Sequence, residues 1–423
     1  MKSSRPANTW TTQTNHLALV VAHRAEDLQL PYALFGMRWY LFIPPVLLTV
    51  ALLTPQVRGF FLQAGWRWVH VLLLSFGISF SLNPLFAGIA VKLNMLDRPD
   101  QRKLHQEATP LLGGAAVFAG FLSALLINGI FSLELGGILI ASMILFAVGV
   151  LDDYKEISAG IKLLAQLICT LFVLGCGIVL RLIPADCGSL APAGNALLTI
   201  IWIIGITNAM NFFDGMDGLA AGLGALIAFF LGVVAFQTAR PFIGWVAVAM
   251  MGSCIGFLPY NFKIKGAASA FLGDAGSTVI GFILACMAVY GDWADGNPVV
   301  ALISPLLIFG ILVFDMLHIT VDRVMSGKVL SIRQWLEYVG QDHLHHRLAH
   351  ALGSKKRSVI FIYALSFCLG ISAVALRNAR VIDAVLLIFQ ASILLVLITL
   401  LERRGRMQTK ASDSKIQAGY WVK

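Results

Sequence analysis

Charged residues are scarce in this sequence. Asp, Glu, Lys and Arg make up 13% of its 423 residues, whereas soluble globular domains carry about 25%. Hydrophobic residues make up 58%, and the mean hydropathy is +0.82. Apolar runs of about 18 residues or more recur along the chain and are long enough to cross a bilayer core. The composition therefore excludes an ordinary soluble enzyme and predicts a polytopic membrane protein.

Several other patterns are missing. The apolar segments do not alternate over about ten residues, which excludes an outer-membrane β-barrel. The six cysteines lie mostly in apolar segments, without metal-ligand or disulfide-framework spacing. The first 35 residues lack the charged-then-apolar pattern of a cleavable signal, and no internal repeat supports a transporter built from inverted halves. We therefore expect an all-α membrane protein with about 11–12 transmembrane helices and an active site on the cytoplasmic face.

Twelve apolar segments are candidate membrane spans. They fall at residues 39–56, 68–91, 111–131, 134–151, 161–183, 195–213, 217–237, 241–260, 276–290, 298–320, 357–376 and 381–401. Long connections rich in lysine and arginine alternate with short ones that are poor in lysine. The positive-inside rule places the basic connections and both chain ends in the cytoplasm. The net charge of +9 then reflects membrane topology, and no nucleic-acid partner is expected.

This topology divides the chain into three parts. We expect a polar arm with an extra span at 1–66, a membrane-embedded domain at 67–401 and a cytoplasmic tail at 402–423. Five polar clusters lie on the predicted cytoplasmic face. The first is "LDRPDQRKLH", whose Arg102, Lys103 and His105 are candidate phosphate partners. Basic residues beside a membrane helix also act as topology anchors, so this cluster alone does not indicate a phosphate-binding site.

The second cluster, "LDDYKEISAGIK", contains Asp152 and Asp153, followed by Lys162. Adjacent carboxylates repel each other and bind protons more tightly unless a cation neutralises them. A helix cap or a solvated interface explains one acid at a membrane edge but explains two less readily. The pair therefore indicates a site for a cation or a phosphate-bearing substrate.

The third cluster is "NAMNFFDGMDGL", between two apolar segments. Its four polar residues, Asn208, Asn211, Asp214 and Asp217, follow at three-residue steps, which would place them on one face of a helix. The stretch "DGMDG" is also good turn chemistry. A turn needs only one or two of these four groups, so the pattern favours a binding site.

The last two clusters supply a further acid and a group of cations. Asp274 lies among glycines in "FLGDAGS", where small residues leave room for a phosphate or a metal ion and a helix start offers N–H groups; Ser277 would serve equally well as a simple cap. The motif "HLHHRL" holds His343, His345, His346 and Arg347. It lacks cysteine partners and the H-E-x-x-H form of zinc sites, so it indicates an anion site.

Together the clusters indicate phosphoryl transfer. Hard oxygen donors suit Mg²⁺, which binds through one or two carboxylates plus substrate phosphates, and Mn²⁺ accepts the same ligands. Phosphoryl transfer needs a metal ion, cationic clamps and an orienting base. Because the clusters converge at the membrane surface, we expect one substrate from the lipid and another from the cytosol.

At this point the motifs match a known family. The chain resembles the polyprenyl-phosphate N-acetylhexosamine-1-phosphate transferases, and most closely the undecaprenyl-phosphate N-acetylglucosaminyl-1-phosphate branch. The five motifs occur in family order over residues 92–348. The resemblance implies that undecaprenyl phosphate attacks the β-phosphorus of a UDP-N-acetylhexosamine, most simply UDP-GlcNAc. UMP then leaves, and the undecaprenyl-diphospho-sugar begins a cell-envelope polysaccharide such as O antigen.

The resemblance also implies roles for individual residues. Asp274 would bind Mg²⁺ with Asn211 beside it, Asp152 would orient or deprotonate the lipid phosphate, and Asp153 would support it. His345 would act at the diphosphate and complete the catalytic set. The remaining positions would bind substrate: Arg102, Lys103, His105, Lys162, Asn208, Asp214, Asp217, His343, His346 and Arg347.

Two departures from the family pattern concern the histidine loop. Many relatives carry an Asp three residues before the first histidine, where this chain has Gly340 and instead places Asp342 next to it. The stretch from Arg323 to His343 is also longer than usual. Both changes leave the donor open to another UDP-N-acetylated sugar or to UDP-MurNAc-pentapeptide. A transporter is the alternative from another class, and a homodimer in the bacterial plasma membrane is a further expectation.

Overall fold

The computed structural model describes residues 39–98, 108–184, 188, 190–263, 266–291, 298–329, 334, 340, 342–376 and 380–420, with side chains only between 42 and 400. The elements in chain order are α3 (Trp39–Leu52), α4 (Pro55–Gln63), α5 (Arg67–Lys92), β1 (Leu96–Asp97), β2 (Thr109–Pro110), α6 (Gly113–Ile127), α7 (Leu133–Tyr154), α8 (Ala159–Gly175), α9 (Leu190–Phe212), the 3-10 turn η2 (Phe213–Gly215), α10 (Leu219–Gln237), α11 (Pro241–Asn261), α12 (Gly273–Tyr290), α13 (Pro298–Ile308), α14 (Gly310–Met325), α16 (Leu344–Leu352), α17 (Lys355–Ala375) and α18 (Val381–Tyr420).

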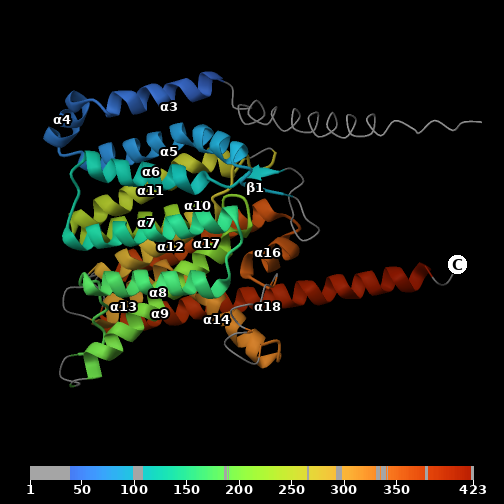
Figure 1. Cartoon of the computed structure of the whole chain (residues 1–423). Helices are drawn as coiled ribbons and strands as arrows, with labels where there is room; N and C mark the ends of the chain where they lie inside the picture. Colours follow the sequence, from blue (N-terminus) through green and yellow to red (C-terminus); the bar gives the residue numbers. More distant parts are fainter. Residues whose placement is uncertain are drawn as a thin grey trace, which may run out of the picture.

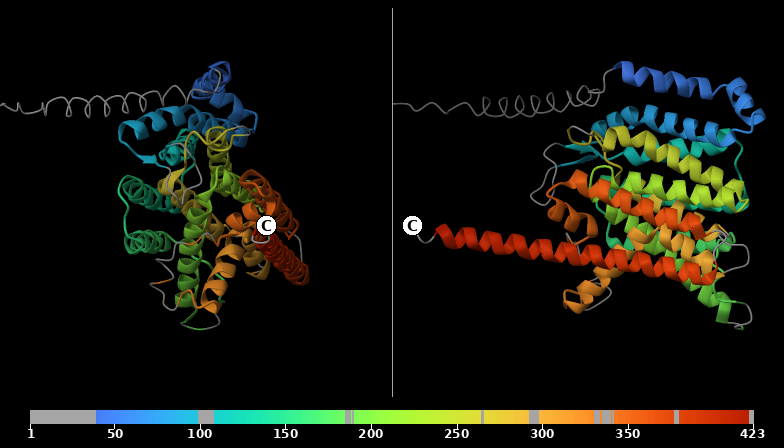
Figure 2. Two further views of the ribbon diagram at one scale, coloured as in Figure 1. Left: turned by 90° about the vertical axis from the view of Figure 1, so that its right-hand side faces the viewer. Right: turned by 180° about the vertical axis from the view of Figure 1, so that it is seen from behind.

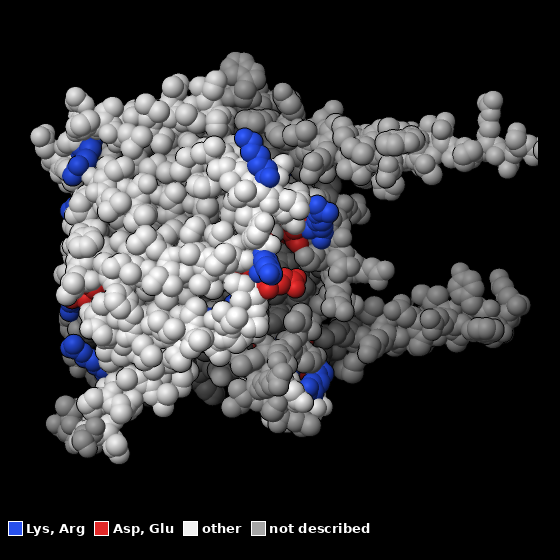
Figure 3. Space-filling model, in the orientation of Figure 1, with Lys and Arg blue, Asp and Glu red and all other residues white. Residues whose placement is uncertain are grey.

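The predicted all-α membrane architecture is confirmed. Within the described residues, eight helices are long and apolar enough to span a membrane, or up to ten if each of two bent pairs counts as one span; α6 and α8 are shorter apolar helices. Each of the twelve predicted segments overlaps one of these helices, although the segment 161–183 extends past the end of α8 at Gly175. The long helices run side by side (Figures 1 and 2). Charged side chains gather mainly toward the two ends of the bundle, with a broad uncharged belt between them (Figure 3).

Two predicted spans are not straight helices. The segment 298–320 was expected to cross the membrane once, but α13 and α14 meet at an angle of 83° next to Phe309. Pro305 lies inside α13 and Gly310 begins α14, and both residue types weaken a continuous helix. Likewise α3 and α4 meet at 76°, and Pro55 is the first residue of α4.

The centre of the bundle is α12, which packs against α6, α7 and α9. Close backbone approach at its start depends on glycine. A Cβ atom on Gly114 of α6 would lie 2.3 Å from the Cα of Gly276, and one on Gly149 of α7 would lie 2.4 Å from the Cα of Ala275. The first turn of α12 is therefore clamped between α6 and the last turns of α7, which brings two acidic clusters together.

At the same end of the bundle lie the short β1–β2 pair and α16 (Figure 1). Leu96 pairs with Pro110 and Asp97 with Thr109 in antiparallel register. The 40-residue α18 extends past this end of the bundle (Figure 2); at 1.5 Å per residue its length is about 60 Å. The polar loops and the end of α18 thus share one side of the molecule.

Candidate active site

Three helix ends meet around a cavity of about 970 Å³. The end of α7 contributes Asp152 and Asp153, the start of α12 contributes Asp274, and the end of α9 contributes Asn211. Among the described residues of the cavity lining, seven Asp or Glu residues stand beside three Lys or Arg residues and one histidine. This part of the wall is therefore rich in acid, which favours a cation beside an anionic substrate.

Asp153 caps the N-terminus of α12. Its carboxylate accepts hydrogen bonds from the backbone N–H of Asp274 at 2.9 Å and of Ala275 at 3.2 Å. Negative charge at a helix N-terminus is stabilising because the first N–H groups have no partner within the helix. Gly273 has φ +74°, and a Cβ there would lie 2.6 Å from Asp153 Oδ2. A glycine is therefore required for the carboxylate to reach the helix.

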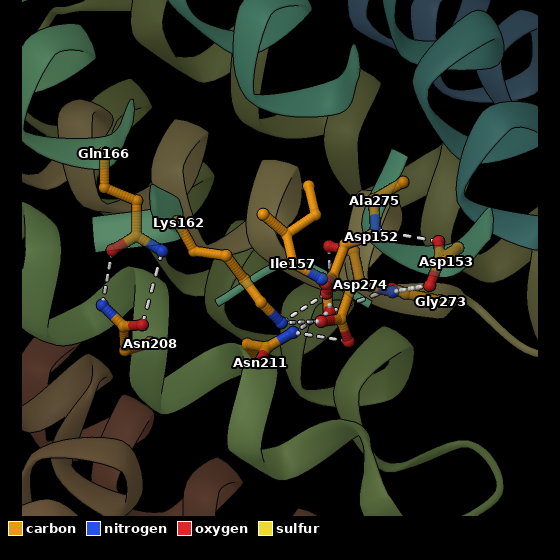
Figure 4. Close-up of polar contacts among 11 residues, drawn as sticks. Asp152, Asp153, Ile157, Lys162, Gln166, Asn208, Asn211, Gly273, Asp274 and Ala275 are labelled. Atoms are coloured by element: carbon orange, nitrogen blue, oxygen red, sulfur yellow. Dashed lines mark hydrogen bonds and ion pairs between the residues drawn. The ribbon is translucent and has the colours of Figure 1, made fainter. Parts of the chain in front are cut away.

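Asp152 points toward Lys162 instead (Figure 4). One carboxylate oxygen accepts the backbone N–H of Ile157 at 2.8 Å, and the other pairs with the Lys162 ammonium. The same ammonium donates to Asp274 Oδ2 at 2.8 Å. Asp152 is 7% exposed, whereas Lys162 and Asp274 are 35% and 36% exposed. The two neighbouring acids predicted from sequence thus have different surroundings, one holding a helix and the other a cation.

Asn211 completes this group. Its amide nitrogen donates to Asp274 Oδ1 at 3.2 Å and to the Ser277 hydroxyl at 2.9 Å. Asn208, one turn earlier on α9, lies apart from the acidic residues (Figure 4) and is not one of the residues that line the cavity. Its amide exchanges hydrogen bonds with Gln166 of α8, at 2.6 and 3.3 Å. Gln166 lies one helical turn after Lys162 on α8. The hydrogen bonds between Gln166 and Asn208 therefore join α8 to α9 one turn away from the lysine.

The prediction of one helical face for all four polar residues of the third cluster is wrong beyond Asn211. Helix α9 ends at Phe212, and Asp214 has non-helical dihedrals in η2. Asp214 and Asp217 nevertheless line the cavity, and Asp217 Oδ2 accepts the Ala268 N–H at 3.1 Å. The stretch "DGMDG" therefore forms a turn and also contributes two acids to the site, so both expectations for it hold.

The histidine motif is divided between the cavity wall and the interior. His346 lines the cavity, whereas His345 is fully buried against the ring of Phe213 at 5.3 Å between centroids. Burial, together with the neighbouring rings of His346 and His343, holds the pKa of His345 well below its usual value. Burial, and then His343, also lowers the pKa of His346. Both rings are therefore neutral at pH 7 without substrate.

The other members of the motif contact α14. His343 precedes α16, and its Nδ1 lies 2.8 Å from Asp315. Arg347 is 5% exposed and contacts the ring of His318 at 3.0 Å. Arg102, Lys103 and His105 of the first cluster lie outside the described residues.

The unusual Asp342 has a clear partner. Arg323 of α14 donates to its two oxygens at 2.8 and 2.7 Å. Burial alone would raise the pKa of Asp342, but the hydrogen bonds and charge of Arg323 lower it overall. Asp342 is therefore held to α14 directly before the histidine motif.

Sequence reasoning missed two kinds of residue. Lys355 at the start of α17 lines the cavity, but in the sequence it is one of several basic loop residues. Asp315 is 0% exposed in the apolar stretch "GILVFDMLH". An ionisable residue within an apolar helix is a recognisable signal of function, and it could have identified Asp315.

The chain is similar in sequence to several known proteins. Residues 135–292, which run from α7 to the end of α12, match the sequence model described as Glycosyl transferase family 4. The chain is 30% identical over 316 residues to the probable undecaprenyl-phosphate N-acetylglucosaminyl 1-phosphate transferase of Bacillus subtilis, covering 73% of this chain and 84% of the relative. The decaprenyl-phosphate N-acetylglucosaminephosphotransferase of Mycobacterium tuberculosis is 30% identical over 307 residues, with 65% and 74% covered. The undecaprenyl-phosphate alpha-N-acetylglucosaminyl 1-phosphate transferase of Yersinia pestis is 30% identical over 294 residues, with 67% and 78% covered.

Proposed function

Because the chain belongs to glycosyl transferase family 4, we propose that it transfers N-acetylglucosamine 1-phosphate from UDP-GlcNAc to undecaprenyl phosphate. A phosphate oxygen of the lipid forms a bond to the β-phosphorus, the bond between that phosphorus and the bridging oxygen breaks, and UMP leaves. The observation that carries the proposal is the cavity at one end of the membrane helices, where carboxylates and a lysine from α7, α8 and α12 converge. The product begins an envelope polysaccharide, O antigen being one such polymer.

We further propose Mg²⁺ as the cofactor, with Mn²⁺ as a substitute. In the described part of the chain, no three acidic, histidine or cysteine side chains lie close enough to hold an ion by themselves. Mg²⁺ commonly binds through one or two carboxylates and completes its coordination with water and substrate phosphate. The Lys162 ammonium between Asp152 and Asp274 supports the fit, because it marks a place where these oxygens favour a cation.

Asp274 and Asn211 would hold the ion, which would neutralise charge on the transferring phosphoryl group. The chain's own residues would perform the remaining tasks. Asp152, which accepts the Ile157 N–H, would keep the Lys162 ammonium in place and through it would orient the lipid phosphate. His346, on the cavity wall, would donate a hydrogen bond to the diphosphate. Asp153 would keep the N-terminus of α12 in place.

The expected orientation places this cavity in the cytoplasm of a bacterial cell. The multi-pass architecture is established, and the basic connections near the cavity support cytoplasmic placement through the positive-inside rule. Cysteines introduced singly at 334 and 188, in a variant whose six native cysteines are replaced, test it, because a membrane-impermeant thiol reagent should reach position 188 in intact cells and position 334 only after lysis. The reverse pattern would overturn the orientation. Light scattering of the purified protein would test for a homodimer.

The decisive assay uses purified protein in detergent with undecaprenyl phosphate and UDP-sugars. UMP release should require both substrates, and UDP-GlcNAc should be turned over faster than UDP-GalNAc or UDP-MurNAc-pentapeptide. Mass spectrometry should show the undecaprenyl-diphospho-sugar. Preference for another donor would correct the sugar, whereas uptake of a solute into vesicles without UMP release would favour a transporter.

A further inference from the structure

Helix α14 presents two different faces. Asp315, His318 and Arg323 follow at helical spacing and all contact the segment that contains the histidine motif. On the opposite face, Leu317, Val321 and Val324 are 63%, 54% and 58% exposed. The polar face of α14 therefore contacts the segment that contains the histidine motif, while its apolar face is exposed on the surface of the protein.

Asp315 makes the most buried of these contacts. Its Oδ2 lies 2.8 Å from His343 Nδ1, and its Oδ1 accepts the backbone N–H of Leu344 at 2.7 Å. The side chain is 0% exposed. A buried carboxylate is costly unless it is fully hydrogen-bonded, and an apolar residue of similar size is often as stable or more stable at such a position. Packing alone therefore gives no reason for an acid here.

The two hydrogen bonds fix the start of α16. His343 is the residue before the helix, and Leu344 is its first residue. The His343 carbonyl then accepts the N–H of His346 at 3.0 Å and of Arg347 at 3.1 Å. The ring of His343 also packs on Phe212, a residue of the cavity lining, at 5.2 Å between centroids. A shift of His343 would therefore move His346, which faces the cavity.

We propose that Asp315 is a positioning residue that acts through His343, holding the first turn of α16 so that His346 faces the donor's diphosphate. The proposal rests on the proposed function for its substrate. Asp315 is 0% exposed and is not one of the residues that line the cavity. With the carboxylate accepting at Nδ1, His343 carries its proton on that nitrogen, because the bond made by one ring nitrogen sets the tautomer.

The first test compares Asp315→Asn with Asp322→Asn. Asp322 lies on the same helix, is 39% exposed and pairs with Lys328 at 3.6 Å, so its replacement is a matched control. If the amide oxygen of the new asparagine still accepts the Leu344 N–H, its amide nitrogen must face His343 Nδ1. Two hydrogen-bond donors would then oppose each other. We expect kcat/KM for UDP-GlcNAc to fall about 10- to 100-fold, the range seen when a group that orients a histidine in a metal site is removed. The Asp322→Asn variant should stay close to wild type.

A spectroscopic test does not depend on turnover. In protein labelled with ¹⁵N-histidine, the His343 signals are assigned from their loss in His343→Asn. The wild-type Nδ1 should be protonated, and in Asp315→Asn the proton should move to Nε2. An unchanged Nδ1 signal in Asp315→Asn would overturn the proposal, even if the wild-type protein turned out to use other substrates.

A rescue experiment separates positioning from simple destabilisation. His343→Asn keeps an N–H donor near the place of Nδ1, whereas His343→Leu removes it. Asparagine should retain more activity than leucine, and Asp315→Asn combined with His343→Leu should be no worse than either single variant, because the two residues act as one unit. Losses that multiply in the double variant, or equal activity of the asparagine and leucine variants, would refute the proposal. The comparison of His343→Asn with His343→Leu stands even if Asp315→Asn fails to fold.

Discussion

Replacing Asp152 with asparagine tests whether this acid removes a proton or holds a cation. In the variant, the amide oxygen can still accept the Ile157 N–H. The amide nitrogen would then face the Lys162 ammonium, and because both groups are donors the hydrogen bond between them is lost. The lost bond is charge-assisted and contributes about 1.5–3 kcal/mol. Since each 1.36 kcal/mol is a factor of ten in rate, kcat should fall roughly 10- to 160-fold, toward the lower end because Lys162 is 35% exposed.

The pH dependence distinguishes the two roles. A lipid phosphate monoester has a second pKa of about 6 by analogy with phosphorylated side chains, so it is largely dianionic at pH 7 and has little need of a base. Both oxygens of Asp152 already have donors, which favours positioning. We therefore expect the rate profile of Asp152→Asn between pH 6 and pH 9 to be lowered evenly, with its shape unchanged. A variant that recovers as the pH rises through about 6 would show instead that a base had been lost.

The neighbouring acid is the matched control for this experiment. Asp153→Asn can accept only one of the two N–H groups at the start of α12, so helix capping is weakened. Thermal unfolding in detergent should shift to lower temperature in Asp153→Asn more than in Asp152→Asn, because a lost cap costs about 0.5–2 kcal/mol. Equal thermal shifts for both variants would contradict the division of labour between these acids.

Three further predictions concern the metal ion, the histidine and the Arg323–Asp342 pair. Chelation should abolish UMP release, Mg²⁺ or Mn²⁺ should restore it, and Asp274→Ala should not recover with either ion; full turnover in chelator would exclude the metal. Burial, and then His343, lowers the pKa of His346, so binding of a diphosphate should be accompanied by proton uptake. KM for UDP-GlcNAc should then decrease from pH 8 to pH 6 in the wild type and vary little in His346→Gln, whereas parallel profiles would place the titrating group elsewhere. Although burial alone would raise it, Arg323 holds the folded-state pKa of Asp342 below its ordinary value, so its contribution to stability is present above the unfolded-state pKa and is lost as the pH falls through the folded value. Arg323→Gln should therefore lower the unfolding temperature at pH 7 and have a smaller effect near pH 3, and an equal effect at both would count against the ion pair.

The sequence predicted the helices well because a membrane span is specified by local properties. A run of apolar residues of sufficient length forms a helix in lipid, since each backbone group must be hydrogen-bonded within the segment. The same reasoning did not predict the bend between α13 and α14. Proline and glycine allow a kink, but the packing of neighbouring helices decides whether a helix bends at them.

The site was predicted as a set of motifs and less well as individual side chains. Asp152, Asp153, Lys162, Asn211 and Asp274 do converge, because charged groups avoid the apolar belt and collect where helices end. Sequence order says nothing of which neighbour of a pair faces inward. Adjacent histidines show this, since successive residues on a helix differ by about 100°, and only His346 of the pair with His345 reaches the cavity.

The residues that place the site come from contacts distant in sequence. The N-terminus of α12 approaches α6 and α7 only because Gly114 and Gly149 carry no side chain, and its capping acid lies 121 residues earlier in the chain. The start of α16 is held by an acid 28 residues before His343. In each case a carboxylate from one helix accepts backbone N–H at the start of another, two groups for Asp153 and one for Asp315, where helix termini favour negative charge. The same physical rule that lets a helix start bind phosphate is thus used twice within the protein to fix the helices that surround the substrate cavity.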